Sequence, residues 1–154
     1  MAGTMEGALC AASLLLCAAG ELDAKDLDAL AGFVTPAYVA MDFTAICARN
    51  DSQFIPQNSG PRGNAIQYAE QVKDEAITSL TPQEAASVVK KAADAARSIA
   101  RRKLQELRAK APKNLRKEVD RWCSNQARSF VREFIDTYDR KHELLQRQME
   151  AAKR

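Results

Sequence analysis

Four cysteines are the residues of this chain best suited to covalent chemistry. Cys10 and Cys17 lie in an uncharged stretch near the N-terminus, whereas Cys47 and Cys123 lie in segments that we expect to be buried helices. No Cys-x-x-Cys spacing occurs, which argues against a redox-active pair. If the N-terminal stretch is removed, Cys47 and Cys123 remain as the only pair, and we expect them to form a disulfide in an oxidising compartment. The alternative is two buried free thiols, as in helical proteins of the cytoplasm.

Other catalytic or metal-binding chemistry has little support. The single histidine, His142, lies in a charged stretch that we expect to be exposed to solvent, and no zinc site combines it with the cysteines at a usual spacing. Neither a Gly-x-Ser-x-Gly motif nor a glycine-rich phosphate loop occurs. Glu70, Asp74 and Glu75 cluster beside Lys73, which is typical of a solvated helix face. We therefore expect no enzymatic activity, no metal and no cofactor.

A basic segment is the most unusual surface feature. The first 89 residues carry 4 basic and 11 acidic side chains, whereas residues 90–154 carry 19 basic and 9 acidic ones. The candidate residues for binding an anion or a partner are Arg97, Arg101, Arg102, Lys103, Arg108, Lys110, Lys113, Arg116 and Lys117. Such a cluster attracts phosphates, anionic lipid head groups or acidic proteins. It contains no aromatic side chain to stack on bases, which argues against single-stranded nucleic acid. A solvated basic surface without a partner is the alternative.

The N-terminal stretch resembles a secretory signal peptide. Residues 8–20 are uncharged and apolar, end in small residues and are followed at once by acidic sequence. The preceding segment departs from the pattern, because its only charge is Glu6. Thirteen apolar residues are too few to span a bilayer as a helix, which takes about 20. We therefore predict a signal peptide at 1–20 and one domain at 21–154, with a buried helix of a cytoplasmic protein or a membrane anchor as alternatives.

The remaining composition favours helices. Glycine and proline are scarce, and only 6% of the residues are aromatic. Thr81-Pro82-Gln83-Glu84 predicts a helix start with a capping box, in which the Thr81 hydroxyl and the Glu84 carboxylate each cap the other's backbone amide. With the preceding Leu80, these residues also resemble the Leu-Thr-x-x-Gln motif of small helical periplasmic stress chaperones, with Glu84 in the place of glutamine. Apolar spacing predicts helices at 22–33, 35–50, 64–79, 82–110 and 112–151, with a loop at 51–63.

We therefore expect an all-α fold, a helical bundle. Its frame would be a long antiparallel hairpin of 82–110 and 112–151, covered by the three shorter helices, and residues 142–154 would project or fray. The function that fits is that of an exported protein, periplasmic or secreted, which acts by binding, adaptor or chaperone-like contact through the basic end of the hairpin. Its partner would be an acidic protein or an anionic envelope surface, and the small residues of 85–96 leave a homodimer open. The alternative is a cytoplasmic protein whose basic hairpin binds nucleic acid.

Overall fold

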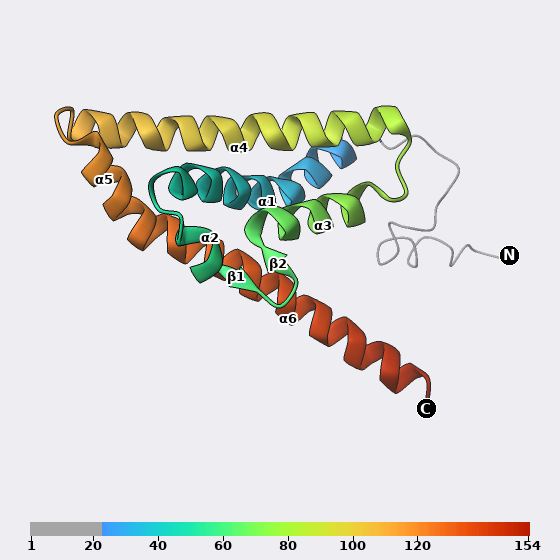
Figure 1. Ribbon diagram of the computed structural model, residues 1–154. Coiled ribbons are helices and arrows are strands. Elements are labelled where there is room, and N and C mark those ends of the chain that lie inside the picture. The colour runs from blue at the N-terminus through green and yellow to red at the C-terminus, as the bar shows by residue number, and fades with distance from the viewer. Residues whose placement is uncertain (1–22) are drawn as a thin grey trace, which may run out of the picture.

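The computed structural model describes residues 23–154 and is almost entirely helical (Figure 1). The predicted signal peptide and Cys10 and Cys17 lie outside the described residues. In chain order the elements are α1 (Ala24–Asn50), α2 (Phe54–Gln57), β1 (Ser59–Gly60), β2 (Gly63–Asn64), α3 (Ala65–Ile77), α4 (Pro82–Lys110), α5 (Leu115–Trp122), the π-helical turn η1 (Cys123–Ala127) and α6 (Arg128–Ala152). The all-α fold class is confirmed. The residues predicted to form one loop contain a short helix, α2, and a hairpin of two strands with two residues each.

Helix α1 is continuous through Pro36, where the sequence predicted two helices, 22–33 and 35–50. The prediction that Thr35 caps a second helix was wrong, because its hydroxyl instead donates to the carbonyl four residues earlier, at 2.7 Å. Pro36 lacks the amide that would bond the carbonyl of Gly32. Both residues are exposed, so that carbonyl can bond to water. The missing hydrogen bond therefore lies on the solvent side, where it costs least.

Helix α1 is the centre of the core. It packs against α3, α4 and α6 (Figure 1). Its buried residues are Ala31, Val34, Ala37, Tyr38, Val39, Ala40, Phe43, Thr44 and Cys47. By length and composition, α1 is the one helix among residues 23–154 that is apolar enough to cross a membrane, but half of its most apolar stretch is buried inside the protein. Packing on several sides accounts for that apolar character.

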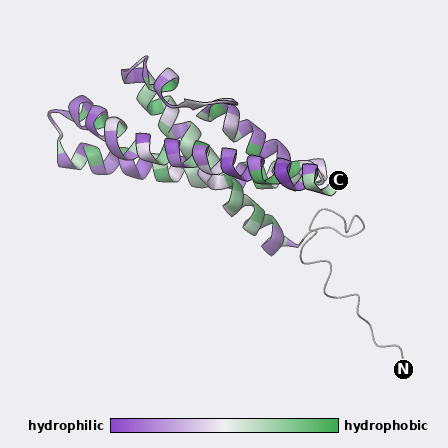
Figure 2. Ribbon diagram, turned by 90° about the horizontal axis from the view of Figure 1, so that it is seen from below, coloured by the Kyte–Doolittle hydropathy of each residue, from purple (hydrophilic) through white to green (hydrophobic). Residues whose placement is uncertain are grey.

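Helix α4 begins at the predicted capping box. The Glu84 amide donates to the Thr81 hydroxyl, and the Glu84 carboxylate accepts from the Thr81 amide at 2.9 Å. Along the helix, small side chains such as Ala92 and Ala96 are fully buried, and α1 is the main neighbour of α4. Ala92 and Ala96 thus serve close packing within the chain. Figure 2 shows hydrophilic and hydrophobic residues alternating along the long helices, as expected where one face of each is buried.

The close antiparallel hairpin predicted for 82–110 and 112–151 is not confirmed. Helices α4 and α5 meet at the turn formed by residues 111–114, and the chain then diverges from α4 through α5, η1 and α6, with α1 and α3 between the two arms (Figure 1). The reason is that α1 is apolar on several faces and needs cover on more than one side. The region 142–154, for which projection or fraying was expected, is helical to Ala152 and extends beyond the other helices.

A disulfide joins the centre of the core to the second arm. Cys47, near the end of α1, is bonded to Cys123, the first residue of η1, and their Cα atoms are 5.6 Å apart. Phe43 packs edge-on against Trp122 at 4.7 Å between ring centroids and against Phe130 at 5.4 Å. The expected pairing is therefore present, and it is embedded in an aromatic cluster that holds α1 against the arm.

The segment between α1 and α3 is held down by side chains. Phe54 is 4% exposed, so it anchors the segment to the core. The β1–β2 hairpin lies against α6, where Arg132 donates to the carbonyl of Ser59 at 2.9 Å. At Gly60 a Cβ atom would lie 2.5 Å from the Tyr68 hydroxyl oxygen, so only glycine fits there. The segment is thus a docked part of the fold.

Candidate anion-binding surface

The basic residues singled out from the sequence gather around the turn between α4 and α5. Arg97, Arg101 and Arg108 follow one another at four and seven residues along α4 and so lie on one face of that helix. Lys113 lies in the turn, and Arg116 lies in the first turn of α5. Eight of the nine candidate residues are exposed, and Lys103 is half-buried. The candidate residues therefore extend from Arg97, in the middle of α4, to Lys117 in the first turn of α5.

Most of these charges have no acidic partner. Arg97 pairs with Asp94 at 3.4 Å, Lys103 with Glu106 at 2.9 Å, and Lys110 is 3.8 Å from Glu118. Within residues 23–154, no ion pair is found for the other six, which are Arg101, Arg102, Arg108, Lys113, Arg116 and Lys117. We call these six residues the basic end. Exposed ion pairs are weak in any case. The basic end therefore keeps an excess of positive charge.

The acidic residues near the start of α1 do not cover the basic end. Asp28, near the start of α1, pairs with Lys91 in the first half of α4, and the start of α1 lies far from the turn between α4 and α5 (Figure 1). Asp42, further along α1, lies near Arg97, and burial raises the pKa of its carboxyl while Arg97 opposes that shift. These acidic residues of α1 thus face Lys91 and Arg97 of α4 and not the six residues of the basic end.

The start of α5 strengthens the positive potential on one side of the turn. Helix α5 begins at Leu115, and no side chain caps its first amides. The N-terminal end of a helix carries a partial positive charge, so Lys113, Arg116 and Lys117 add to a positive field there. At the end of α4, Arg108 and Lys110 instead complement the negative end of that helix. The potential for an anion is therefore expected to be strongest on the α5 side of the turn.

The basic end offers charge and little else. No residue from Lys103 to Lys117 belongs to the exposed large hydrophobic residues of the described chain, and none of them is aromatic. The surface therefore lacks stacking platforms for bases and apolar wedges for insertion into a bilayer. Binding there would be electrostatic and sensitive to salt.

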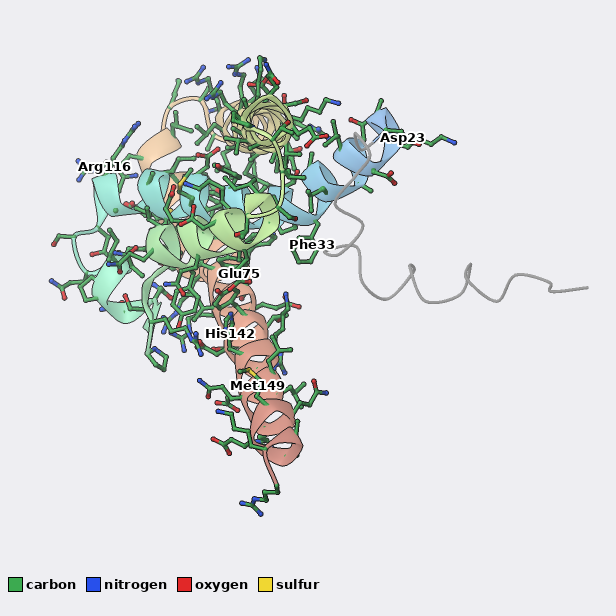
Figure 3. All side chains as sticks on the ribbon, turned by 90° about the vertical axis from the view of Figure 1, so that its right-hand side faces the viewer. Asp23, Phe33, Glu75, Arg116, His142 and Met149 are labelled. Atoms are coloured by element: carbon green, nitrogen blue, oxygen red, sulfur yellow. A yellow bond between two sulfur atoms is a disulfide. The ribbon has the colours of Figure 1, made fainter. Side chains whose placement is uncertain are left out.

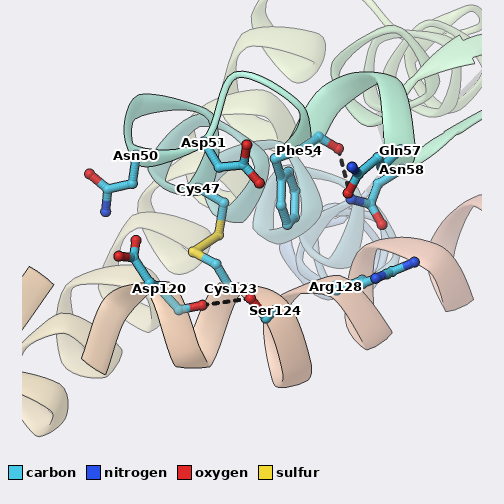
Figure 4. Close-up of a pocket in the computed structure, with 10 residues that line it drawn as sticks. All are labelled: Cys47, Asn50, Asp51, Phe54, Gln57, Asn58, Asp120, Cys123, Ser124 and Arg128. Atoms are coloured by element: carbon cyan, nitrogen blue, oxygen red, sulfur yellow. Dashed lines mark hydrogen bonds between the residues drawn. A yellow bond between two sulfur atoms is a disulfide. The ribbon is translucent and has the colours of Figure 1, made fainter. Parts of the chain in front are cut away.

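A polar hollow of about 260 Å³ lies beside the disulfide (Figure 4). Asp51, Asp120 and Arg128 contribute charged groups to its lining. Asn58 donates from Nδ2 to the Phe54 carbonyl at 2.7 Å, while its buried Oδ1 has no protein partner. Both lining cysteines are in the disulfide, so the hollow has no thiol nucleophile, and it has no histidine base. This arrangement carries no recognisable catalytic mechanism.

A second polar cluster joins α3 to α6, and the sequence did not predict it. The Tyr138 hydroxyl donates to Glu75 at 2.6 Å, and His142 Nε2 lies 3.0 Å from the same carboxylate oxygen. His142 was expected to be solvated, but its side chain is only 20% exposed and stacks on Tyr138. Beside this pair, the Tyr68 hydroxyl donates to Asp139 at 2.9 Å. Figure 3 shows Glu75 and His142 where α6 leaves the body of the protein.

This second cluster is structural in character. Burial, followed by the hydrogen bond to Glu75, raises the pKa of Tyr138 well above its ordinary value of 10.0, so the phenol stays protonated and acts as a donor. Arg62 lies 3.4 Å from Asp139 and 5.9 Å from the centre of the Tyr138 ring, which completes the contacts between the hairpin, α3 and α6. A sequence signal existed only in part: Tyr138 and His142 are four residues apart on one helix face, but the distant Glu75 gave no sign of pairing with them.

Residues 23–154 contain no group of three or more histidine, cysteine, aspartate or glutamate side chains arranged to hold a metal ion. Among the surfaces described, the basic end is therefore the one whose chemistry indicates a class of ligand, namely anions. Comparisons of this chain with models of protein families, with curated proteins and with solved structures found no match.

Proposed function

We propose that this protein is a non-catalytic binding protein of an extracytoplasmic compartment, periplasmic or secreted, which docks through its basic end onto an anionic envelope surface. The observation that carries the proposal is the set of six basic side chains at one end of the fold without ion pairs to residues 23–154. Long-range attraction to a surface of negative charge needs such an excess and needs no cleft.

The shape of the basic end favours a broad anionic surface over an inserted peptide. The turn between α4 and α5 is the outermost part of that end of the molecule (Figure 1), and neither the hollow beside the disulfide nor the open depression beside Ser129 includes any of the six residues. A protruding surface can approach a flat array of head groups without a cleft. The lack of exposed apolar groups at this end predicts peripheral, reversible attachment.

The disulfide supports the compartment assigned in this proposal. Such bonds persist outside the cytoplasm and are rare in reducing compartments. The apolar stretch at 8–20 points the same way. In the native host, the N-terminus of the mature protein tests this part directly: a chain that retains residue 1 by mass spectrometry would contradict export through a cleaved signal peptide.

The docking itself is tested with vesicles. Wild-type protein should sediment with vesicles that contain an anionic phospholipid and not with zwitterionic ones, and the bound fraction should fall as salt rises. Reversal of Lys113, Arg116 and Lys117, the residues of the basic end on the α5 side of the turn, to glutamate should greatly weaken this binding. A matched control reverses Arg147, Lys153 and Arg154, which gives the same net charge at the opposite end and should bind far better than the first variant.

Two outcomes would contradict the proposal. Equal binding by the two charge-reversed variants would mean that net charge, and not the basic end, drives attachment. Absence of vesicle binding at low salt would exclude the anionic membrane surface. Duplex DNA in the same assay tests the cytoplasmic alternative, since retention on DNA without retention on vesicles would favour nucleic acid.

A further inference from the structure

The hollow beside the disulfide is lined by charged groups of both signs that do not pair with one another. Asp51 follows α1, Asp120 lies on α5, and Arg128 is the first residue of α6. Within residues 23–154, none of these three side chains forms an ion pair. Both signs are therefore available to a ligand, and a ligand that itself carries both signs can satisfy them together.

The charges are spread along the hollow. Figure 4 shows Asp120 and Arg128 on opposite sides of the disulfide, with Asp51 between them. Asp120 and Arg128 are eight residues apart on a continuous helical stretch, which is about 12 Å along the helix axis. Negative charge therefore lies over one part of the hollow and positive charge at the other end, so a ligand must present its own charges in the opposite order.

A buried acceptor in the lining indicates that the ligand donates hydrogen bonds. Asn58 lines the hollow and is only 2% exposed. Its Nδ2 donates to the Phe54 carbonyl at 2.7 Å, whereas its Oδ1 has no hydrogen-bond partner among residues 23–154. An unpaired buried acceptor costs free energy, which a donor placed beside Asn58 recovers. This atom is independent of the three charged groups, and it points to an N–H donor on the ligand.

The size and walls of the hollow limit the ligand to a small polar molecule. Its volume of about 260 Å³ lies just below the range of about 300–1,000 Å³ that is usual for ligand sites. One wall is the end of α1 with the segment that follows it, and the other is the arm of α5, η1 and α6. The bond between Cys47 and Cys123 links these two walls, so the charged groups of both are held at one place.

We propose that this hollow binds a basic α-amino acid, a molecule with one carboxylate and two cationic groups. Arg128 holds the carboxylate, the α-ammonium group donates to Asn58 and Asp51, and the cation of the ligand's side chain pairs with Asp120. Two carboxylates and one guanidinium give the hollow a net charge of −1, which this ligand neutralises. A diamine would leave Arg128 unpaired, and a dicarboxylate would meet like charge at Asp51 and Asp120. None of the six residues of the basic end lines the hollow, so this site is independent of the anionic partner.

Isothermal titration calorimetry of the oxidised protein with L-lysine as the probe tests the ligand class. Two analogues each remove one feature of lysine: norleucine lacks the ammonium group of the side chain, and 1,5-diaminopentane lacks the carboxylate. Lysine should bind, and each analogue should bind about tenfold more weakly, because each loses one charge-assisted hydrogen bond. Absence of lysine binding up to about 10 mM would overturn the proposal. Equal binding of lysine and either analogue would also overturn it.

Substitutions test the partner of each end of the ligand. Asp120→Asn should abolish the preference for lysine over norleucine, and Arg128→Gln should abolish the preference for lysine over diaminopentane. The matched controls Glu150→Gln and Arg147→Gln make the same charge changes on the projecting part of α6 and should bind lysine as the wild type does. All four residues are exposed, so thermal melts should show that the variants remain folded. A preference that persists in its variant, or a control that weakens lysine binding equally, would show that the hollow is not the binding site.

Discussion

Breaking the disulfide should strongly destabilise this protein. Cys47 and Cys123 are 76 residues apart in the chain, so the bond closes a long loop in the unfolded state. The chain-entropy relation gives about 4 kcal/mol for a loop of this length, and native bonds often deliver roughly 2–4 kcal/mol because unfolded chains keep some structure. For a domain of this size, 4 kcal/mol corresponds to a fall in melting temperature of roughly 15 °C.

Two perturbations separate the chain-entropy effect from packing. Reduction of the wild-type protein breaks the bond but leaves both sulfur atoms in the core, where Cys47 is fully buried and Cys123 is 5% exposed. The double variant Cys47→Ala/Cys123→Ala also removes the sulfur atoms, and the small voids that remain should cost a further amount of about 1 kcal/mol. The reduced wild type should therefore melt between the oxidised wild type and the double variant.

Thermal unfolding followed by circular dichroism gives the melting temperatures, and mass spectrometry after thiol alkylation under denaturing, non-reducing conditions gives the bonding state. Alkylation of both Cys47 and Cys123 in protein from its native compartment would show that the bond is absent there. If the oxidised and fully reduced proteins melt at the same temperature, loop closure by the disulfide does not stabilise this fold.

Four further substitutions test the packing, the charge and the capping of the fold. Gly60→Ala should destabilise the fold by about 1–3 kcal/mol, because its Cβ would lie 2.5 Å from the Tyr68 hydroxyl oxygen. Gly32→Ala, in open space on α1, should instead stabilise the fold by about 0.5–1 kcal/mol. If urea titrations gave changes in unfolding free energy of the same sign for both variants, the contacts described would be contradicted. Asp42→Asn should stabilise the fold at neutral pH, because burial raises the pKa of this carboxyl above its ordinary value of 3.8. The contribution of the protonated Asp42 to stability is therefore complete below pH 3.8 and is lost as the pH rises through the folded-state pKa. A stability advantage of the variant that persists undiminished in acid would refute this. Thr81→Ala should cost about 1 kcal/mol through loss of the cap of α4, and unchanged denaturation midpoints would show the cap to be dispensable.

Local signals in the sequence predicted the parts of the fold that depend on neighbouring residues. The capping box at Thr81 and the apolar spacing of α3 involve residues a few positions apart, so a linear pattern contains them. The pairing of Cys47 with Cys123 was also predicted, on the expectation that a cleaved N-terminal stretch would leave no other cysteine. Thr35-Pro36 led to a wrong helix start for a physical reason. The same dipeptide starts a helix in many proteins, and only the exposure of Gly32 shows that α1 can continue through Pro36.

Features that depend on distant segments could not be predicted in the same way. The divergence of α6 from α4 follows from the insertion of α1 between them, and spacing within each helix does not encode that order of packing. His142 was expected to be solvated because its sequence neighbours are charged, while its partner Glu75 lies on another helix. The π-helical turn at Cys123 likewise has no signature in this sequence that we can identify. The basic end was recognisable from composition because its residues lie close together in the sequence, on both sides of one turn.

The disulfide and the basic end are physically linked. Cys123 follows α5 directly, and Arg116 and Lys117 are on α5. The bond to Cys47 therefore fixes the helix that carries these two charges. A binding surface composed of two helices loses affinity when one of them moves freely, because association must then also order that helix. In a reducing compartment α5 would lack this covalent anchor, and the charges of α4 and α5 would no longer be held in one arrangement. The oxidised form is therefore expected to bind an anionic surface more tightly than the reduced form, with an equal net charge in both. Equal vesicle binding by the two forms, under conditions in which both remain folded, would show that the charges act without a fixed arrangement.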